Sequence, residues 1–403
     1  MSYCKTQIGD LVTLRQGFAI NKKTNHHMSE EPTMLHLLRI GDMKDGNFSI
    51  FVRDTIPEKF IAKENDIIYT RTGQVGLVFR NQYGVVHNNC FTVTSNDEDV
   101  LSQQYLYYAL QEESFYEEAN SRATGAAQPD LPHGAFNSIE IFLPPVEVQR
   151  RITNILDAYN SLIDNNQKQI KLLEEAAQRL YKEWFVDLRF PGYEGTEIVD
   201  GVPSGWKKTV LNEVFSFERG KSYASKELSD SEGVVLVNLK NIQAWGGYKR
   251  EAEKRFIGKY KESQTVEFGD IVMAVTDMTQ ERRLVGHVAL VPDLGEKATY
   301  SMDLIKLIPS KGINSFFLYS SLRYSGIAEN ISKHANGTNV LHLKPDSIMG
   351  LEYIIPSAEL MDLFGSMVET ICKKVEVLQS QMILLSNARD RLLPKLMSGE
   401  IEV

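Results

Sequence analysis

The chain repeats itself at an interval of about 205 residues. A repeat this long indicates two duplicated domains, because the units of solenoid proteins are only roughly 20–50 residues long. Two similar modules predict a molecule with pseudo-two-fold symmetry, suited to a ligand that offers two sites at a fixed separation. The repeated segments are Ile8–Val12 with Arg15-Gln16-Gly17, and Leu211–Phe215 with Glu218-Arg219-Gly220; Asn65–Ile68 and Gly269–Val272; Thr124-Gly125-Ala126 and Asn336-Gly337-Thr338.

Each copy closes with a proline and a helical pattern of about 40 residues. Apolar residues spaced by heptads over this length predict two coiled-coil helices, each spanning roughly 57 Å. Packed antiparallel, the two helices would hold the modules apart as a rigid spacer. The first stripe follows Pro144-Pro145 and comprises Ile152, Ile155, Tyr159, Leu162, Leu173 and Leu180, flanked by Ile163, Ile170, Ala177 and Trp184; it runs to Phe185, before Pro191-Gly192. The second follows Pro356 and comprises Phe364, Met367, Ile371, Leu378, Leu385 and Leu392, flanked by Val375 and Met382.

Polar residues interrupt both stripes, namely Asn166 and Gln169 in the first, Lys374 and Gln381 in the second. Such residues either lie in the helix interface, where they fix the register of the pair, or face water on a widened helix. Both interpretations stay open at this point.

Between the helical segments, short β-like runs alternate with Gly, Asn and Asp. Short helices are expected at Gln103–Glu118 and Ser315–Ile331. The predicted fold is therefore α+β, with two similar mixed α/β modules of about 145 residues separated by the two helices. The expected strands are Leu35–Ile40, Asp66–Thr70, Leu77–Arg80 and Cys90–Val93 in the first module, and Val234–Leu239, Asp270–Val275, Gly286–Val291 and Asp303–Leu307 in the second.

Composition excludes several classes of protein. Of 403 residues, 42% are hydrophobic and 24% charged, which is typical of a globular protein. There is no run of eighteen apolar residues and the start MSYCKTQIGD lacks an apolar signal segment, so we expect a cytoplasmic protein without a membrane partner. Cys4, Cys90 and Cys372 are scattered and predict reduced thiols, not a disulfide framework or a metal site.

Candidate nucleic-acid contacts lie in the turns that follow the predicted strands, at matching places in both modules. Arg, Gln and Asn side chains can bind base edges bidentately, and Lys and Arg can bind phosphates. The net charge of −9 excludes a generally basic nucleic-acid binder but leaves room for local basic loops. The candidates in the first module are Lys22, Lys23, Arg71, Thr72, Gln74, Arg122, Thr124 and Gln128. Those in the second are Lys221, Tyr223, Thr276, Gln280, Arg282, Arg283, Asn336, Thr338 and Asn339, and the basic segment Lys249–Lys261 adds further phosphate contacts.

The order module, helix, module, helix resembles the specificity subunit of type I restriction-modification systems over essentially the whole chain. The second copy departs from the pattern, since Val340 replaces the glutamine of the turn motif and Leu360-Met361 stands where Glu-x-Gln would begin the helix. The matching motifs are Asn65–Ile68, Thr124–Gln128, Leu143-Pro144-Pro145 with Glu147-Val148-Gln149, Leu172-Leu173-Glu174, Leu180–Phe185 and the tail Arg391–Ile401.

The resemblance implies two target recognition domains, residues 1–145 and 191–355, each reading half of a bipartite double-stranded DNA site. The helical segments 146–190 and 356–403 would set the gap and bind the modification subunits. It further implies a non-catalytic chain that needs no cofactor. The modification (methyltransferase) subunits would bind S-adenosylmethionine, and a restriction (translocase/endonuclease) subunit would use ATP and Mg. The expected partner-binding residues are Ile152, Tyr159, Leu173, Leu180, Trp184, Phe364, Ile371, Leu378, Leu385 and Leu392.

Two rival classes are weaker. An enzyme would need a catalytic constellation, but Gly220-Lys221-Ser222 lacks the first glycine of a P-loop and no HExxH motif is present. A coiled-coil scaffold would fit the acidic segment Glu112–Glu118 but has no need of duplicated, loop-rich modules. A recognition protein that works with a single fused enzyme also remains possible.

Overall fold

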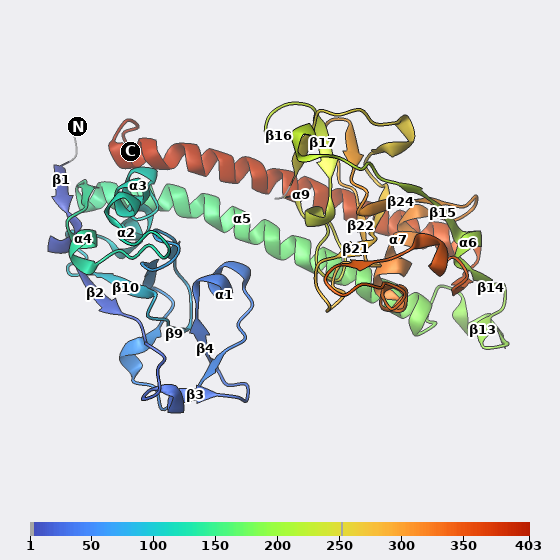
Figure 1. Cartoon of the computed structure of the whole chain (residues 1–403), viewed down its shortest axis with the longest axis horizontal. Helices are drawn as coiled ribbons and strands as arrows, with labels where there is room; N and C mark the ends of the chain where they lie inside the picture. The colour runs from blue at the N-terminus through green and yellow to red at the C-terminus, as the bar shows by residue number, and fades with distance from the viewer. Residues whose placement is uncertain (1–3, 251–252) are drawn as a thin grey trace. The chain divides into compact units, whose positions relative to one another are not determined.

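The computed structural model describes residues 4–250 and 253–403. These residues form two compact units. Unit 1 contains the described residues up to Asn165 together with Met382–Val403, and unit 2 contains Asn166–Gln381. Each unit therefore consists of one module and parts of two long helices (Figure 1).

The module of unit 1 is built on three small sheets, with strand orders β1-β11, β2-β10-β7-β8 and β3-β5-β4-β9-β6. The pairing is antiparallel except between β4 and β9. The strands are β1 (Cys4–Gln7), β2 (Val12–Gln16), β3 (Met28–Ser29), β4 (Leu35–Leu38), β5 (Phe51–Val52), β6 (Ile61–Ala62), β7 (Ile67–Thr70), β8 (Val78–Phe79), β9 (Gly84–Val86), β10 (Cys90–Ser95) and β11 (Glu140–Leu143).

The module of unit 2 repeats this topology sheet for sheet, which confirms the predicted duplication. Its corresponding orders are β14-β26, β15-β24-β20-β22 and β16-β18-β17-β23-β19, and β17 pairs with β23 in parallel as β4 does with β9. The strands are β12 (Ile198–Val199), β13 (Val202–Pro203), β14 (Lys207–Val210), β15 (Phe215–Arg219), β16 (Leu228–Ser229), β17 (Val234–Val237), β18 (Lys254–Phe256), β19 (Thr265–Val266), β20 (Ile271–Ala274), β21 (Thr276–Asp277), β22 (Val288–Leu290), β23 (Ala298–Tyr300), β24 (Leu304–Pro309), β25 (Leu341–His342) and β26 (Glu352–Ile355).

Each predicted short helix is broken in two, which corrects the single helices expected. In the first module Glu112 adopts an extended conformation (ψ 138°), and in the second Gly326 takes a left-handed φ of 81°. The short helices are α1 (Ile40–Asp45), α2 (Gln103–Ala109), α3 (Glu113–Arg122), α4 (His133–Asn137), α6 (Leu211–Val214), α7 (Ser315–Tyr324) and α8 (Ile327–Ser332).

The long helices α5 (Val146–Tyr181) and α9 (Ala358–Ser398) confirm the heptad prediction. A π-helical turn, Lys182–Val186, follows α5, whereas α9 continues through Pro394. Among the residues that the structure describes, no helix is long and apolar enough to cross a membrane.

Within each unit the two helices run antiparallel. In unit 1, Arg389 Nη1 donates a hydrogen bond to Asn160 Oδ1 at 2.7 Å, and Ile152, earlier on α5, shares a buried cluster with Leu396, later on α9. In unit 2, Asn166 Nδ2 donates to Gln381 Oε1 at 3.4 Å, and the rings of Trp184 and Phe364 are 5.8 Å apart. Asn166 is only 7% exposed, so this asparagine is a buried polar residue in the helix interface.

The flanking row of α5 is better buried than the main one. Ile170, Ala177 and Trp184 are at most 8% exposed and Ile163 is half-buried, and Leu156, one heptad before Ile163, is also buried. The stripe predicted as the main one is only partly buried, and Leu162 is 51% exposed. The wide apolar face of α5 is therefore divided between the chain's own core and the surface.

The largest cores join each module to its helices. In unit 1, Ile8, Tyr69, Phe91 and Tyr105 pack with Ile152, Leu156, Leu396 and Met397. In unit 2, Phe215, Met273 and Phe317 pack with Tyr181, Trp184, Phe364 and Val368. The hydrophobic effect over these clusters holds each module on its helices.

Candidate nucleic-acid interface

A glycine at the same place in each module lets two backbone segments touch. A Cβ on Gly17 would lie 2.2 Å from the carbonyl oxygen of His87, and one on Gly220 would lie 2.0 Å from that of Ser301. The next residues, Phe18 and Lys221, form parallel bridges with His87 and Ser301. Both modules therefore lead the chain out of the sheet into a candidate loop in the same way.

The loop after β7 is fixed by an ion pair. Arg71 Nη2 and Asp130 Oδ2 are 2.6 Å apart, Arg71 Nη1 donates to Gln16 Oε1 at 3.0 Å, and the Thr72 hydroxyl donates to Asp130 at 2.5 Å. The Arg71 guanidinium holds the pKa of Asp130 below its usual value. This arrangement keeps the turns around residues 71 and 130 together.

Backbone hydrogen bonds also hold these turns together, and we call the bonded turns around residues 71, 124 and 130 the loop joint. Thr124 and Asp130 exchange both N–H···O bonds, at 2.9 and 2.8 Å, and Gly73 N–H donates to Pro129 O at 2.8 Å. The joint leaves Gln74, Thr124 and Gln128 exposed at the surface. These side chains are the ones free to approach a ligand in the first module.

The second module builds the same joint from different residues. Thr276 and Asn336 both bridge to His342, just as Thr72 and Thr124 both bridge to Asp130. Gln280 Nε2 donates to the carbonyl of Thr338 at 2.7 Å. Two loops distant in sequence are thus held together in both modules.

Asp277 organises the loop that precedes β22. Its carboxylate is buried and accepts hydrogen bonds from the backbone N–H of Leu284 (2.7 Å) and Val285 (3.2 Å), and from Thr279 N and Oγ1 (both 2.9 Å). Burial acts to raise the pKa of Asp277, but these hydrogen bonds outweigh it and lower the pKa below its usual value.

Four of the predicted DNA contacts are bonded within the protein or buried, and their role in DNA contact stays a prediction. The guanidinium groups of Arg71 and Arg122 are engaged within the protein, Arg122 with Glu118 and Ser138. Thr276 is only 7% exposed, and Arg282 Nη1 donates to the carbonyl of Ser332 at 2.9 Å. These residues shape the loops, and nothing in sequence spacing could distinguish that task from base contact.

The other candidates lie on the surface or partly so. Lys22 and Lys23 are exposed in a turn that Thr24 closes by donating to Ala19 O at 2.8 Å. Lys221 and Tyr223 are half-buried, and burial raises the pKa of Tyr223. Gln280, Arg283, Asn336, Thr338 and Asn339 are exposed. Their role in DNA contact stays a prediction.

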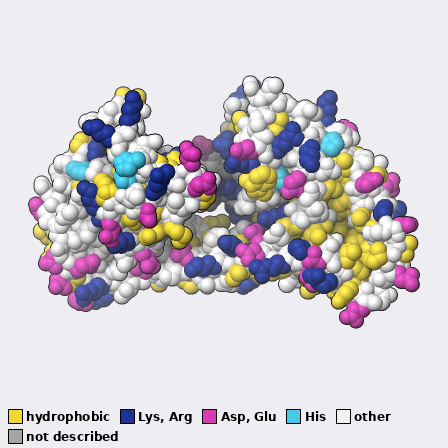
Figure 2. Space-filling model, turned by 90° about the horizontal axis from the view of Figure 1, so that it is seen from below, with side chains coloured by type: hydrophobic (Ala, Val, Ile, Leu, Met, Phe, Trp, Pro, Cys, Tyr) yellow, Lys and Arg dark blue, Asp and Glu magenta, His cyan; other side chains and the backbone are white. Residues whose placement is uncertain are grey.

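The basic segment of the second module is partly paired. Arg250 forms an ion pair with Glu376, and Arg255 one with Glu296 at 2.6 Å. Lys254, Lys259 and Lys261 are exposed. On the face that Figure 2 draws, Lys and Arg side chains are interspersed with Asp and Glu side chains.

Trp245 was missed from the sequence. The residue is 55% exposed with a φ of 67°, and its backbone N–H donates to the carbonyl of Arg283 at 2.8 Å. An exposed aromatic ring beside a candidate loop is able to contact a ligand. Two glycines directly after the tryptophan, both with positive φ, were the available signal.

The predicted partner-binding residues fall into two groups. Ile152, Trp184, Phe364 and Leu378 are buried in the chain itself, and their role in partner binding stays a prediction. Tyr159, Leu173, Leu180, Ile371, Leu385 and Leu392 are half-buried. Helix residues that the sequence did not single out are more exposed, notably Leu172 (63%), Leu384 (67%) and Val377 (49%).

Among the described residues, no group of His, Cys, Asp and Glu side chains is arranged to hold a metal ion. Burial raises the pKa of the Cys90 thiol to about 12, so this cysteine is a poor nucleophile. The candidate site consists of polar loops on two modules of the same sheet topology.

Comparison with known proteins agrees with this arrangement. Residues 3–175 match the family model described as type I restriction modification DNA specificity domain. The fold of the chain is shared with the S subunit of a type I restriction-modification system from M. genitalium, with a TM-score of 0.60, 17% identity, and coverage of 98% of this chain and 96% of that one. Residues 3–175 are therefore similar to DNA specificity domains, and the chain as a whole shares the fold of an S subunit.

Curated relatives extend the match beyond the first module. The MjaIX specificity subunit of a Methanocaldococcus jannaschii type I restriction enzyme is 27% identical, over 85% of this chain and 79% of its own length. The HindI specificity subunit from Haemophilus influenzae is 22% identical, over 85% and 88%. Over most of its length the chain is therefore similar in sequence to specificity subunits of type I restriction enzymes.

Proposed function

We propose that each module reads one half of a bipartite double-stranded DNA site. The observation that carries this proposal is the recurrence of the loop joint, Thr72 and Thr124 around Asp130 in one module and Thr276 and Asn336 around His342 in the other. Equivalent loops on frames of equal topology serve equivalent tasks, while the differing side chains on them allow different bases to be read.

The exposed side chains of the loops have the required chemistry. The exposed amides of Gln128 and Asn339 present a donor and an acceptor together, as bidentate contact to adenine requires. Those of Gln74 and Gln280 would exchange their hydrogen bonds with Lys44 and the Thr338 carbonyl to do the same. Exposed lysines, including Lys22 and Lys23, supply phosphate contacts, which position the module without reading sequence.

The helices α5 and α9 set the gap between the two half-sites and bind the modification subunits. Exposed apolar side chains on both helices support the second role, since such residues on a soluble helix favour a protein partner. They are Leu162 and Leu172 on α5, and Leu363, Met367, Val377, Ile383 and Leu384 on α9.

The chain itself performs no chemistry in this proposal. The modification subunits bind S-adenosylmethionine and methylate DNA, and the restriction subunit uses ATP and Mg to translocate and cut it, all in the cytoplasm. The names of the relatives, which are specificity subunits of type I restriction enzymes, support this division of labour.

The test is to purify the chain with its partners from the host and to map methylated sites in the host DNA. We expect co-purification of a methyltransferase and a two-part methylated motif. Replacing residues 1–145 by the equivalent module of another specificity subunit should change one half of that motif. Loss of both halves together, or purification without a methyltransferase, would contradict the proposal.

A further inference from the structure

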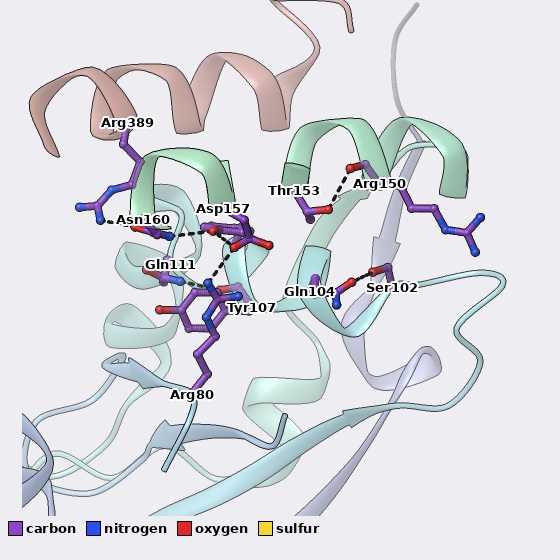
Figure 3. Close-up of polar contacts among 11 residues, drawn as sticks. Arg80, Ser102, Gln104, Tyr107, Gln111, Arg150, Thr153, Asp157, Asn160 and Arg389 are labelled. Carbon is purple, nitrogen blue, oxygen red and sulfur yellow. Dashed lines mark hydrogen bonds and ion pairs between the residues drawn. The ribbon is translucent and has the colours of Figure 1, made fainter. Parts of the chain in front are cut away.

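A chain of polar contacts lies where the first module meets α5 and α9 in unit 1 (Figure 3). Arg80, at the end of β8, forms an ion pair with Asp157 of α5, with Nη2 and Oδ1 2.7 Å apart. The guanidinium also lies over the ring of Tyr107, 4.2 Å from its centroid. Arg80 is only 22% exposed, so water screens this pair less than a surface pair.

The contacts continue from the module through α5 to α9. The hydroxyl of Tyr108 donates to Asp157 Oδ1 at 2.5 Å, and Asn160 Nδ2 donates to that hydroxyl at 2.7 Å. Arg389 of α9 donates in turn to Asn160 Oδ1 at 2.7 Å. Strand β8, helix α2 and the two long helices are thus joined by directional bonds.

The corresponding junction of unit 2 uses other residues. When Ile152 is aligned with Phe364, Asp157 corresponds to Glu369, Asn160 to Cys372 and Arg389 to Ala177. The pairing of β20 with β22 places Leu290 where Arg80 stands. The buried arginine there is Arg323 of α7, whose guanidinium lies 5.3 Å from the ring centroid of Tyr324 and 3.8 Å from Glu174.

We propose that Arg80 is a positioning residue that fixes the angle of the first module on α5 and α9, and thereby the number of base pairs that the complex accepts between the two half-sites. The apolar contacts at this junction, such as those of Ile152 and Leu156, are non-directional and permit the module to rock. A charge-assisted pair with a stacked guanidinium fixes orientation. The proposal rests on the proposed function of the chain.

The experiment uses the assembled complex with its modification subunits. The substrates are duplexes in which both half-sites are constant and the gap is varied by single base pairs. For Arg80→Met we expect the preference for the native gap over its neighbours to fall about tenfold, as loss of one charge-assisted contact implies, with the bases read in both halves unchanged. Arg80→Lys keeps the charge but loses the planar fork, and should restore part of the preference.

The control is Arg150→Met, which removes an exposed ion pair with Glu147 on the same helix and should leave gap preference unchanged. Asp157→Asn removes the charge of the partner of Arg80 and should reduce the gap preference as much as Arg80→Met does. If Arg80→Met does not fold, Asp157→Asn tests the proposal in its place. An unchanged gap preference in folded Arg80→Met, or in Asp157→Asn, overturns the proposal. A wild-type complex that methylates no two-part site contradicts the proposed function instead.

Discussion

The buried amide of Gln149 on α5 ties the start of α2 to the start of the long helix. Its Oε1 accepts a hydrogen bond from the Ser102 N–H at 2.8 Å, and its Nε2 donates to Val100 O at 2.8 Å and Pro144 O at 2.9 Å. Gln149 is 0% exposed. One side chain therefore satisfies three backbone groups that water cannot reach.

The second module has no such glutamine. Met361 occupies the position of Gln149 and is buried. Asn314, at the position of Ser102, caps its own helix by accepting from Phe316 N at 3.0 Å and Phe317 N at 3.2 Å, whereas the side chain of Ser102 makes no capping bond. The two modules therefore fix the start of this helix through different side chains.

Gln149→Ala should lower the free energy of unfolding of unit 1 by about 2–4 kcal/mol, because it leaves buried backbone groups without partners and creates a cavity. The measurement is the urea midpoint of the purified chain, followed by hydrogen exchange at residues 100–110. The control Gln167→Ala changes an exposed residue of the same helix and should have almost no effect. Equal midpoints for the two variants would show that the amide is dispensable.

Changing both Lys22 and Lys23 to Ala should weaken DNA binding by the complex and reduce the slope of log affinity against log salt by about 1.8, since each phosphate contact contributes about 0.9. The bases read should not change. Lys311→Ala, at an exposed turn of the second module, is the comparison. An unaltered slope would remove Lys22 and Lys23 from the interface.

Arg71→Met tests a different role. Because Arg71 is bonded to Asp130 and Gln16, we expect this change to loosen the loop joint and to reduce affinity for the first half-site at least about tenfold. The salt slope should change by less than about 0.5, because no phosphate contact is lost. A slope reduced by about 0.9 would mean that Arg71 binds a phosphate directly.

We expect the stability of the second module to fall in acid because of Asp277. Its pKa is lowered in the folded state, so its stabilising effect is present above the unfolded pKa of about 3.9 and is lost as pH falls through the lower folded pKa. Asp277→Asn places an amide donor against backbone donors and should cost about 1–3 kcal/mol at pH 7.

Urea midpoints between pH 7 and pH 3 measure this dependence. The difference between wild type and Asp277→Asn should be constant above about pH 5 and shrink below about pH 4. Asp346→Asn, at an exposed aspartate, provides the reference. A difference that does not vary with pH would exclude the carboxylate charge as the cause.

Leu172→Ser and Leu384→Ser test the helix surface that we propose for the modification subunits. Each should reduce co-purification of these subunits by about tenfold, which corresponds to ~1.4 kcal/mol, and leave the stability of the chain within about 0.5 kcal/mol. Met34→Ser changes a side chain that is 85% exposed on the first module and should retain the partners. Retention of the partners by both leucine variants would place the binding surface elsewhere.

The sequence was enough to predict the duplicated modules, the two long helices and eight strands, but not the other, mostly short, strands. It could not separate the buried row of α5 from the exposed one, because Leu156 and Leu162 differ only in what packs against them. Break points such as Glu112 also escaped, since their conformation depends on tertiary contacts.

The hydrogen bonds among the candidate loops could not be predicted from the sequence. Residues 71–73 are bonded to residues 129–131, and Thr124 is paired with Asp130. That Arg71 would be bonded to Asp130 depends on two turns distant in sequence, and no spacing rule reports such a pairing. The same limit explains why Trp245 was missed.

The core of unit 1 contains Leu396 and Met397, which lie near the C-terminus, beside residues such as Ile8 from the other end of the sequence. During synthesis the first module therefore emerges long before the residues that complete its core, whereas unit 2 needs only the early part of α9. We therefore expect the module that is synthesised first to complete its core last. A chain that is released before the last turns of α9 are synthesised would have a complete unit 2, while unit 1 would still expose apolar surface.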